Sequence, residues 1–321
     1  MIKYFRAAGH RVAGVFFDNT NNPVDPNKIG GVIRHKGNKK TLDMVRARLG
    51  GDPDVILAKN YAAPLLSRRL FPKSTLVYLV SGSPQMMKLS ERGVSANKYL
   101  VSKNIEIFKQ ESRAFAISDY VVPNSAIGRE LLVKHYGDSA KILKPVDTSL
   151  ARYLNIENKY FSKRRYNVAF ICSNMRRSVK NARLARNIFS KLGAKKKIAI
   201  GHGSDMFSNI NNVECLPAMT QDRIIRILSN TRLVICTSYY DASPNIVREA
   251  LDCGSNVLVS KNCGWSELYP HQFVCEDVYD EDEWVEKASL LIKKNVKFPL
   301  KKDEKAKSRE ILAGLREVLD G

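Results

Sequence analysis

Short, continuous apolar runs alternate with helix-length stretches along most of this chain, and that alternation constrains the fold more than any other feature. Runs rich in Val and Ile are typical of strands buried on both faces of a sheet. In the first half the expected strands are Val12–Phe17, Val55–Ala58, Thr75–Val80, Tyr120–Pro123 and Lys141–Leu143. In the second half they are Asn167–Cys172, Lys197–Ile200, Asn212–Cys215, Leu233–Thr237, Asn256–Ser260 and Gln272–Cys275. The helices expected between them include Ser125–His135, Val179–Leu192 and Asp222–Ser229.

The length and the alternation together predict two domains. A chain of 321 residues is more than twice the length of a typical single domain. Strands that alternate with helices favour parallel sheets joined by right-handed crossovers. The segment between Thr148 and Tyr166 shows no clear periodicity and ends in a basic cluster. We therefore expect an α/β protein with Rossmann-like domains at 1–150 and 163–300, followed by a C-terminal helix at 301–321.

The charge of the chain predicts an anionic partner. Lys and Arg number 53 against 32 Asp and Glu, for a net charge of +21. The stretch from Lys163 to Lys197 holds 12 basic residues and no acidic residue. The stretch from Lys59 to Arg113 is also basic and would dock on an anionic membrane surface; a solvated basic surface is the alternative interpretation. No specific nucleic acid is expected, because the basic run lacks interleaved aromatic residues and no nucleic-acid motif is visible.

The cysteines and the apolar runs predict a cytoplasmic protein, with any membrane contact peripheral and at the inner face. All six cysteines lie in the second half, form no CxxC pair and mostly fall inside apolar runs. Cysteines in that setting are typical of small buried hydrophobic residues in a reducing compartment. No apolar run reaches the ~18 residues of a membrane-spanning helix. The N-terminus lacks the apolar core of a signal peptide.

The stretch "DASPNIVREALDCGSNVLVS" combines two acids with a helix start. Asp241 follows the carboxyl end of an expected strand, which is where open α/β sheets bind ligands. Ser243 is the expected N-cap and Pro244 the expected first helical residue, which places Glu249 on the polar face of the helix. Free N–H groups at a helix start bind anions. The combination suits a ligand with hydroxyls at one end and phosphate at the other, such as a sugar nucleotide; ordinary surface acids are the alternative.

The same stretch resembles the signature of glycosyltransferase family 4. That signature has an acid, seven residues, a Glu, "A-x-x-x-G", a strand, a glycine loop and another Glu. In this sequence the matching positions are Asp241, Glu249, Ala250, Gly254, Gly264 and Glu267. Four further stretches are similar to motifs of the family: "VVPNSAIGRELLVKHYGDSAKILKPVD", "FICSNMRRSVKN", "IGHGSD" and "GHRVAGVFF". The resemblance covers most of the chain and is tightest from Val121 to Tyr269.

The resemblance implies a GT-B enzyme, in which two Rossmann-like, doubly wound parallel-sheet domains face each other across a cleft. Such enzymes transfer a sugar from a nucleotide donor with retention of configuration and need no metal and no cofactor. By position, Asp241 would contact the donor sugar and Glu249 the ribose hydroxyls, and both are the expected catalytic residues. The other expected substrate-binding residues are Arg176, Arg177 and Lys180 for the diphosphate, with Gly203, Ser243, Pro244, Asn245 and Ile246.

The expected partners are therefore a nucleotide sugar and an acceptor, a glycan or a lipid, that the sequence does not name. The first alternative is a non-catalytic GT-B relative that binds a nucleotide sugar or a partner. A nucleic-acid-binding protein is the second and weaker alternative. A shortened N-terminus favours the first alternative, because Ile2–Ala8 reads as the helix before "GHRV" and the family's first strand and glycine loop are missing. Gly30 and Gly31 do not replace that loop.

Two further departures from the family affect the expected site. Asp241 stands where the family usually has Glu, and its shorter side chain shifts the carboxylate by about one bond. Ser81 or Ser83 stands in the region where members often carry a histidine after the third strand of the first domain.

Overall fold

The structure is a computed structural model and describes the chain in segments. The described residues are 11, 14–17, 32–35, 43, 45–47, 49–59, 61–80, 101–146, 160–193, 196–296 and 313–316. The predictions at Ile2–Ala8, at Gly30 and Gly31, and at Ser81 and Ser83 lie outside these residues. The expected boundary segment lies mostly outside them as well, since 147–159 are not described.

The second half of the chain forms a parallel sheet in the order β11-β10-β9-β6-β7-β8. Every pairing in this sheet is parallel. The strands are β6 Tyr166–Asn174, β7 Lys197–His202, β8 Val213–Leu216, β9 Thr231–Cys236, β10 Asn256–Ser260 and β11 Val274–Cys275. All six were predicted from apolar runs. The interiors of β6, β7, β9 and β10 are buried, as parallel strands covered on both faces should be, whereas the edge strand β8 is half-buried.

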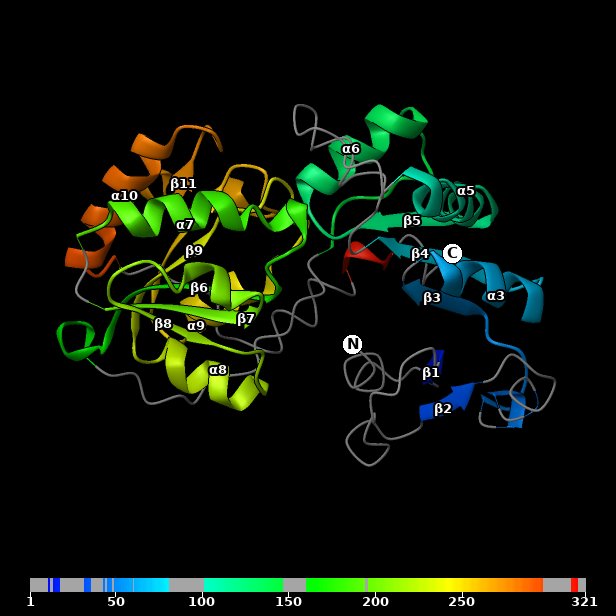
Figure 1. The fold of residues 1–321 in the computed structure, drawn as a ribbon. Helices are drawn as coiled ribbons and strands as arrows, with labels where there is room; N and C mark the ends of the chain where they lie inside the picture. The colour runs from blue at the N-terminus through cyan, green and yellow to red at the C-terminus, as the bar shows by residue number, and fades with distance from the viewer. Residues whose placement is uncertain are drawn as a thin grey trace.

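Helices cover both faces of this sheet (Figure 1). Helices α7 Ala182–Lys191 and α10 Glu281–Lys293 contact each other on one face. Helices α8 Gln221–Leu228 and α9 Asn245–Asp252 contact each other on the other face. The predicted helix Val179–Leu192 is divided, because Asn181 adopts a left-handed conformation with φ of 47°. A short 3₁₀ turn, Ser178–Lys180, precedes it, and the Asn181 side chain caps α7 by accepting from the N–H of Leu184.

The first half of the chain forms two smaller parallel sheets. The three-stranded sheet has the order β3-β4-β5, with β3 Val55–Lys59, β4 Thr75–Val80 and β5 Tyr120–Pro123. The two-stranded sheet pairs β1 Gly14–Phe17 with β2 Val32–His35. The helices are α3 Ala62–Leu70, α5 Val101–Ile117 and α6 Ala126–Tyr136. The prediction of a strand at Lys141–Leu143 is wrong in length. Only an isolated bridge between Val121 and Ile142 forms there. Pro145 limits further pairing because proline has no backbone N–H to donate.

The sheet of the first half is interrupted between β1 and β3. A doubly wound sheet built from these strands would run β2-β1, then one more strand, then β3-β4-β5. Within the described residues no strand joins β1 to β3.

The C-terminal segment contacts the first half. Leu315 is fully buried in a cluster with Val77, Leu79 and Val146. A Cβ placed on Gly314 would lie 2.5 Å from a methyl carbon of Val146. The expected helix 301–321 is described only at 313–316, which return to the sheet β3-β4-β5 (Figure 1).

The two halves touch through one buried cluster. Val179, Tyr240 and Ala242, from loops of the second half, share this cluster with residues of β4, β5 and α6. A Cβ on Gly264 would lie 1.8 Å from the Ala242 carbonyl oxygen and 2.7 Å from the Ser125 Cβ. Only glycine fits there. The loop 239–242 is therefore held between the two halves of the protein.

Candidate active site

An ion pair joins two loops at the carboxyl end of the six-stranded sheet. The Lys180 ammonium lies 2.5 Å from Oδ2 of Asp241, and their side chains are only 20% and 18% exposed. Oδ1 of Asp241 accepts from the N–H of Ser243 at 3.3 Å. The structure thus brings together the cation expected to hold phosphate and the acid expected to hold sugar.

The charge on Lys180 is stabilised by its surroundings. Burial of the side chain lowers its pKa, but the Asp241 carboxylate acts in the opposite direction through charge and hydrogen bonding, and the net pKa is raised. The backbone of Lys180 is fixed as well, because the Thr237 hydroxyl donates to the carbonyls of Lys180 and Asn181 at 3.1 and 3.0 Å. The ammonium is therefore a preorganised positive charge at the end of β6 and β9.

Arg176 and Arg177 are exposed on the turn that follows β6. The N–H of Arg176 donates to the side-chain oxygen of Asn174 at 2.9 Å. Gly203 has φ of +88°, and a Cβ there would lie 3.1 Å from the Arg176 Cγ. The glycine therefore lets the turn after β7 lie directly against Arg176.

Glu249 lies half-buried on α9, where one carboxylate oxygen accepts a hydrogen bond from the Gln221 side-chain amide. Gln221 is the first residue of α8. Gln221 was not predicted from the sequence, because no local pattern connects two residues 28 positions apart.

The start of α9 differs from the prediction. Pro244, with φ of −71°, occupies the N-cap position and Asn245 is the first helical residue, so Ser243 is not the cap. The reason is that the Asp241 carboxylate already accepts from the Ser243 N–H, which closes a turn one residue before the helix. Asn245 is exposed and Ile246 half-buried at the first turn of α9.

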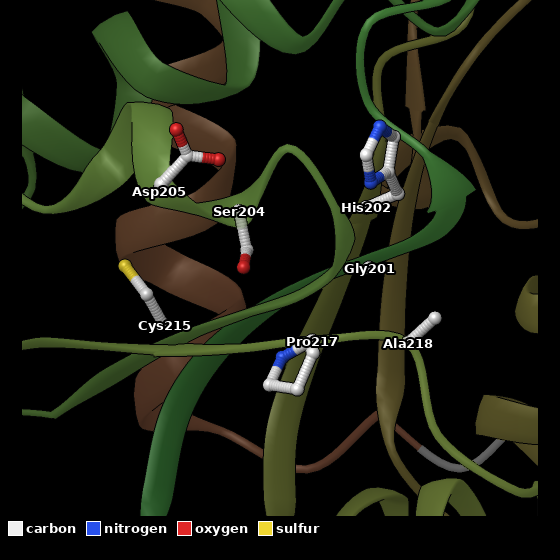
Figure 2. A pocket seen from close by; sticks show the side chains of 7 residues that line it. All are labelled: Gly201, His202, Ser204, Asp205, Cys215, Pro217 and Ala218. Carbon is white, nitrogen blue, oxygen red and sulfur yellow. The ribbon is translucent and has the colours of Figure 1, made fainter.

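An open pocket of about 440 Å³ lies at the carboxyl ends of β7 and β8. Figure 2 shows the side chains that surround it, from β7, β8 and the short turns that follow these strands. Its lining residues are Gly201, His202, Ser204, Asp205, Cys215, Pro217 and Ala218. Apart from the glycine loop around Gly203, this pocket was not predicted from the sequence. Residues such as Pro217 and Ala218 match no binding or catalytic motif.

Residues 204–309 match the family model described as glycosyl transferases group 1. This part of the chain is similar to the group 1 glycosyltransferases. The match includes Asp241, Glu249 and most of the residues that line the pocket. It stops short of the turn that carries Lys180 and the two arginines.

Solved structures with the same fold place the whole chain among GT-B proteins. The fold matches sucrose-phosphate synthase from Thermosynechococcus elongatus with a TM-score of 0.67 and 13% identity, over 98% of this chain and 86% of that one. It matches WaaG, a glycosyltransferase involved in lipopolysaccharide biosynthesis, with a TM-score of 0.60 and 12% identity, over 99% and 90%. It matches Anabaena HepE, solved with UDP and glucose, with a TM-score of 0.58 and 14% identity, over 89% and 82%. No curated protein matches by sequence.

The GT-B fold predicted from the sequence is therefore confirmed, and so is the resemblance to group 1 glycosyltransferases. The narrower assignment to family 4 stays a prediction. The roles of the individual site residues also stay predictions.

Proposed function

We propose that the protein is a retaining glycosyltransferase that moves a sugar from a nucleotide sugar to a glycan or lipid acceptor. The observation that carries this proposal is the contact between Lys180 and Asp241. In a nucleotide sugar the terminal phosphate is bonded directly to the anomeric carbon. A cation that holds the phosphate and an acid that holds the sugar must therefore lie within a few ångströms of each other.

The other expected residues fit the rest of such a donor. We assign the exposed Arg176 and Arg177 to the diphosphate, together with the backbone N–H groups at the start of α9. The Glu249 carboxylate can accept two hydrogen bonds from a ribose diol, and the Gln221 amide fixes its orientation. The pocket at the ends of β7 and β8 is the proposed place of the nucleobase.

The proposed chemistry rests on charge stabilisation. When the sugar leaves, the nucleoside diphosphate gains negative charge, and fixed cations lower the barrier of that step. We assign this role to Lys180 with Arg176 and Arg177, and we propose that the reaction uses no cofactor. Transfer should accordingly persist after treatment with EDTA, and a loss of activity that added Mg²⁺ restores would contradict the assignment.

The acceptor side offers a basic surface for membrane contact. Within the described residues, Lys59, Arg69, Lys73 and Arg113 are exposed on the first half. Arg68 is engaged instead, donating to the Ile117 carbonyl and to Asp119. We infer a peripheral, cytoplasmic protein whose first half contacts anionic lipid. No helix in the described part of the chain is long and apolar enough to cross a membrane. Co-sedimentation with vesicles of phosphatidylserine, compared with neutral vesicles, tests the contact.

A non-catalytic donor-binding protein is the second candidate, and the interruption between β1 and β3 favours it. An incomplete first sheet would leave the acceptor side without its usual loop. The two candidates share the donor site and differ in turnover. Release of sugar from the donor in the absence of acceptor occurs only if the protein is a transferase.

A thermal-shift panel tests the donor site. UDP, GDP, ADP and the matching nucleosides are added to the full chain. A ligand that binds only the native state stabilises it, by about 2.7 kcal/mol at 100 times its Kd. We expect one nucleoside diphosphate to raise the melting temperature and its nucleoside to act less. Glu249→Ala should abolish the shift, and Glu286→Ala, an exposed glutamate on α10, should leave it unchanged. The proposed donor site is wrong if no diphosphate stabilises the folded protein at millimolar concentration.

A further inference from the structure

Two buried cysteines lie against each other beneath the loop that carries Asp241. Cys236 is the last residue of β9, and Cys263 lies in the turn after β10. Their sulfur atoms are 3.7 Å apart, and the residues are 6% and 0% exposed. The contact follows from the sheet, because β9 and β10 are neighbours and Cys236 pairs with Val259.

The distance between the sulfur atoms is within reach of a covalent bond. A disulfide needs sulfur atoms about 2.05 Å apart, so an approach of less than 2 Å along the existing contact would close it. Cys263 sits in a turn, which is easier to displace than the interior of a strand. The geometry therefore permits a bond without rearrangement of the sheet.

The two thiols differ in character. A hydrogen bond from the Cys263 thiol lowers the pKa of Cys236, and the nearby Lys180 ammonium acts in the same direction although burial opposes it. The same contact and burial raise the pKa of Cys263. Cys236 therefore has the lower thiol pKa and the greater exposure of the two, 6% against 0%, so it is the sulfur assigned to react first as thiolate.

We propose that Cys236 and Cys263 form a redox modification site, at which hydrogen peroxide converts the two thiols into a disulfide. The Cys236 thiolate attacks one peroxide oxygen, the O–O bond breaks, and Cys236 becomes a sulfenic acid while water leaves. The Cys263 sulfur then attacks the sulfenic sulfur, the S–O bond breaks, and a second water leaves. The two thiols lose two electrons, and one hydrogen peroxide is reduced to two waters.

The disulfide would act on the site through the backbone of the Cys263 turn. The N–H of Asp241 donates to the Asn262 carbonyl at 3.3 Å, and the N–H of Gly264 donates to the Asp241 carbonyl at 2.7 Å. Asp241 is thus tied to the residues on either side of Cys263. Drawing Cys263 toward Cys236 pulls on both bonds and changes the position of Asp241 relative to Lys180. The consequence for donor binding rests on the proposed function; the disulfide itself does not.

Peptide mapping tests the chemical step. The full chain is treated with hydrogen peroxide, quenched, unfolded in an alkylating agent and digested without reductant. We expect a linked peptide pair containing Cys236 and Cys263, lighter by two hydrogen atoms than the reduced pair and separated by dithiothreitol. Cys253, whose sulfur contacts the Ile225 carbonyl, is the internal control and should be recovered alkylated. Recovery of unlinked Cys236 and Cys263, or only of their higher oxides, overturns the proposal.

Two further measurements test the coupling. Oxidation should speed hydrogen exchange at the Asp241 and Gly264 amides, a readout that needs no ligand. It should also weaken nucleoside diphosphate binding about tenfold, the effect of losing one charge-assisted contact, and dithiothreitol should restore it. In the Cys236→Ser variant, peroxide should change neither the hydrogen exchange nor the affinity for the diphosphate. If the disulfide forms and neither exchange nor affinity changes, the coupling is wrong. If the reduced protein binds no diphosphate while exchange still responds, the proposed function fails and the redox site stands.

Discussion

The Lys180 ammonium and the Asp241 carboxylate lie 2.5 Å apart, although 61 positions separate them in the sequence. Lys180 precedes α7 and Asp241 follows β9, so neighbouring strands of one parallel sheet bring them together. Each fixes the other, because an ammonium and a carboxylate that are both mostly buried are stable only as a pair. The geometry of the proposed donor site depends on this contact.

Lys180→Ala should weaken nucleoside diphosphate more than nucleoside. The lost charge-assisted contact should cost the diphosphate about 1.5–3 kcal/mol of binding free energy. The affinity for the nucleoside should stay nearly unchanged. The double change Arg176→Ala with Arg177→Ala should act in the same direction. Calorimetric titration measures both ligands, and Arg223→Ala on α8, also an exposed arginine, is the matched control. Equal weakening of both ligands would place the phosphate elsewhere.

Glu249→Gln should reduce affinity for the nucleoside itself, because an amide no longer offers two acceptors to the ribose diol. Gln221→Leu should give a smaller loss, since Gln221 only orients the carboxylate that it donates to. Titration with ribonucleoside and 2′-deoxyribonucleoside diphosphates separates the roles. Both variants should discriminate less between the two sugars than the parent does. Unchanged discrimination in Glu249→Gln would rule out the ribose contact.

The ion pair should lose its effect on stability at alkaline pH. The pKa of Lys180 is raised in the folded protein, so the stabilisation is complete below the unfolded value near 10.5 and is lost as the pH rises through the folded value. The melting-temperature difference between parent and Asp241→Asn should therefore be constant to about pH 10 and shrink above it. Asp52→Asn is the control, because its partner Arg46 stays charged throughout. A difference that stays constant to pH 12 would contradict the assignment.

The second half of the fold could be predicted from the sequence more completely than the first. Strands β4 and β10 match the expected ranges residue for residue, because continuous apolar runs encode burial on both faces. Strand β2, with the sequence VIRH, was missed because its charged residues break the apolar run. Helix α10 was also missed, although the cap at Asp280 and the acids of its first turn are a recognisable start signal.

The contacts of the site could be predicted only where a motif carried them. Asp241, Glu249 and Lys180 stand in recognisable patterns, and the structure places all three at loops or a helix on the carboxyl side of the sheet. The pairing of Lys180 with Asp241, the bond from Gln221 and the contact of Cys236 with Cys263 join residues far apart in sequence. Such contacts depend on strand order, which local periodicity does not specify.

The interruption between β1 and β3 predicts unequal protection of the two halves. Strand β1 has one neighbour among the described strands, whereas β9 lies between β10 and β6. Amides 14–17 should therefore exchange with solvent much faster than amides 233–236 in the ligand-free chain. Hydrogen-exchange mass spectrometry compares the two peptides in one sample. Equal protection would mean that the first sheet is complete and that the expected missing strand is wrong.

The most direct test of the account is the fate of the donor sugar. The protein is incubated without acceptor with the sugar nucleotide whose diphosphate stabilises it most, and the released sugar is followed by proton NMR from the first minutes. We predict slow release of sugar whose first-formed anomer has the configuration of the donor, abolished in Glu249→Ala and retained in Glu286→Ala. Release of the opposite anomer would contradict retention. No release above the protein-free rate, from a donor that binds, would contradict the assignment as a transferase.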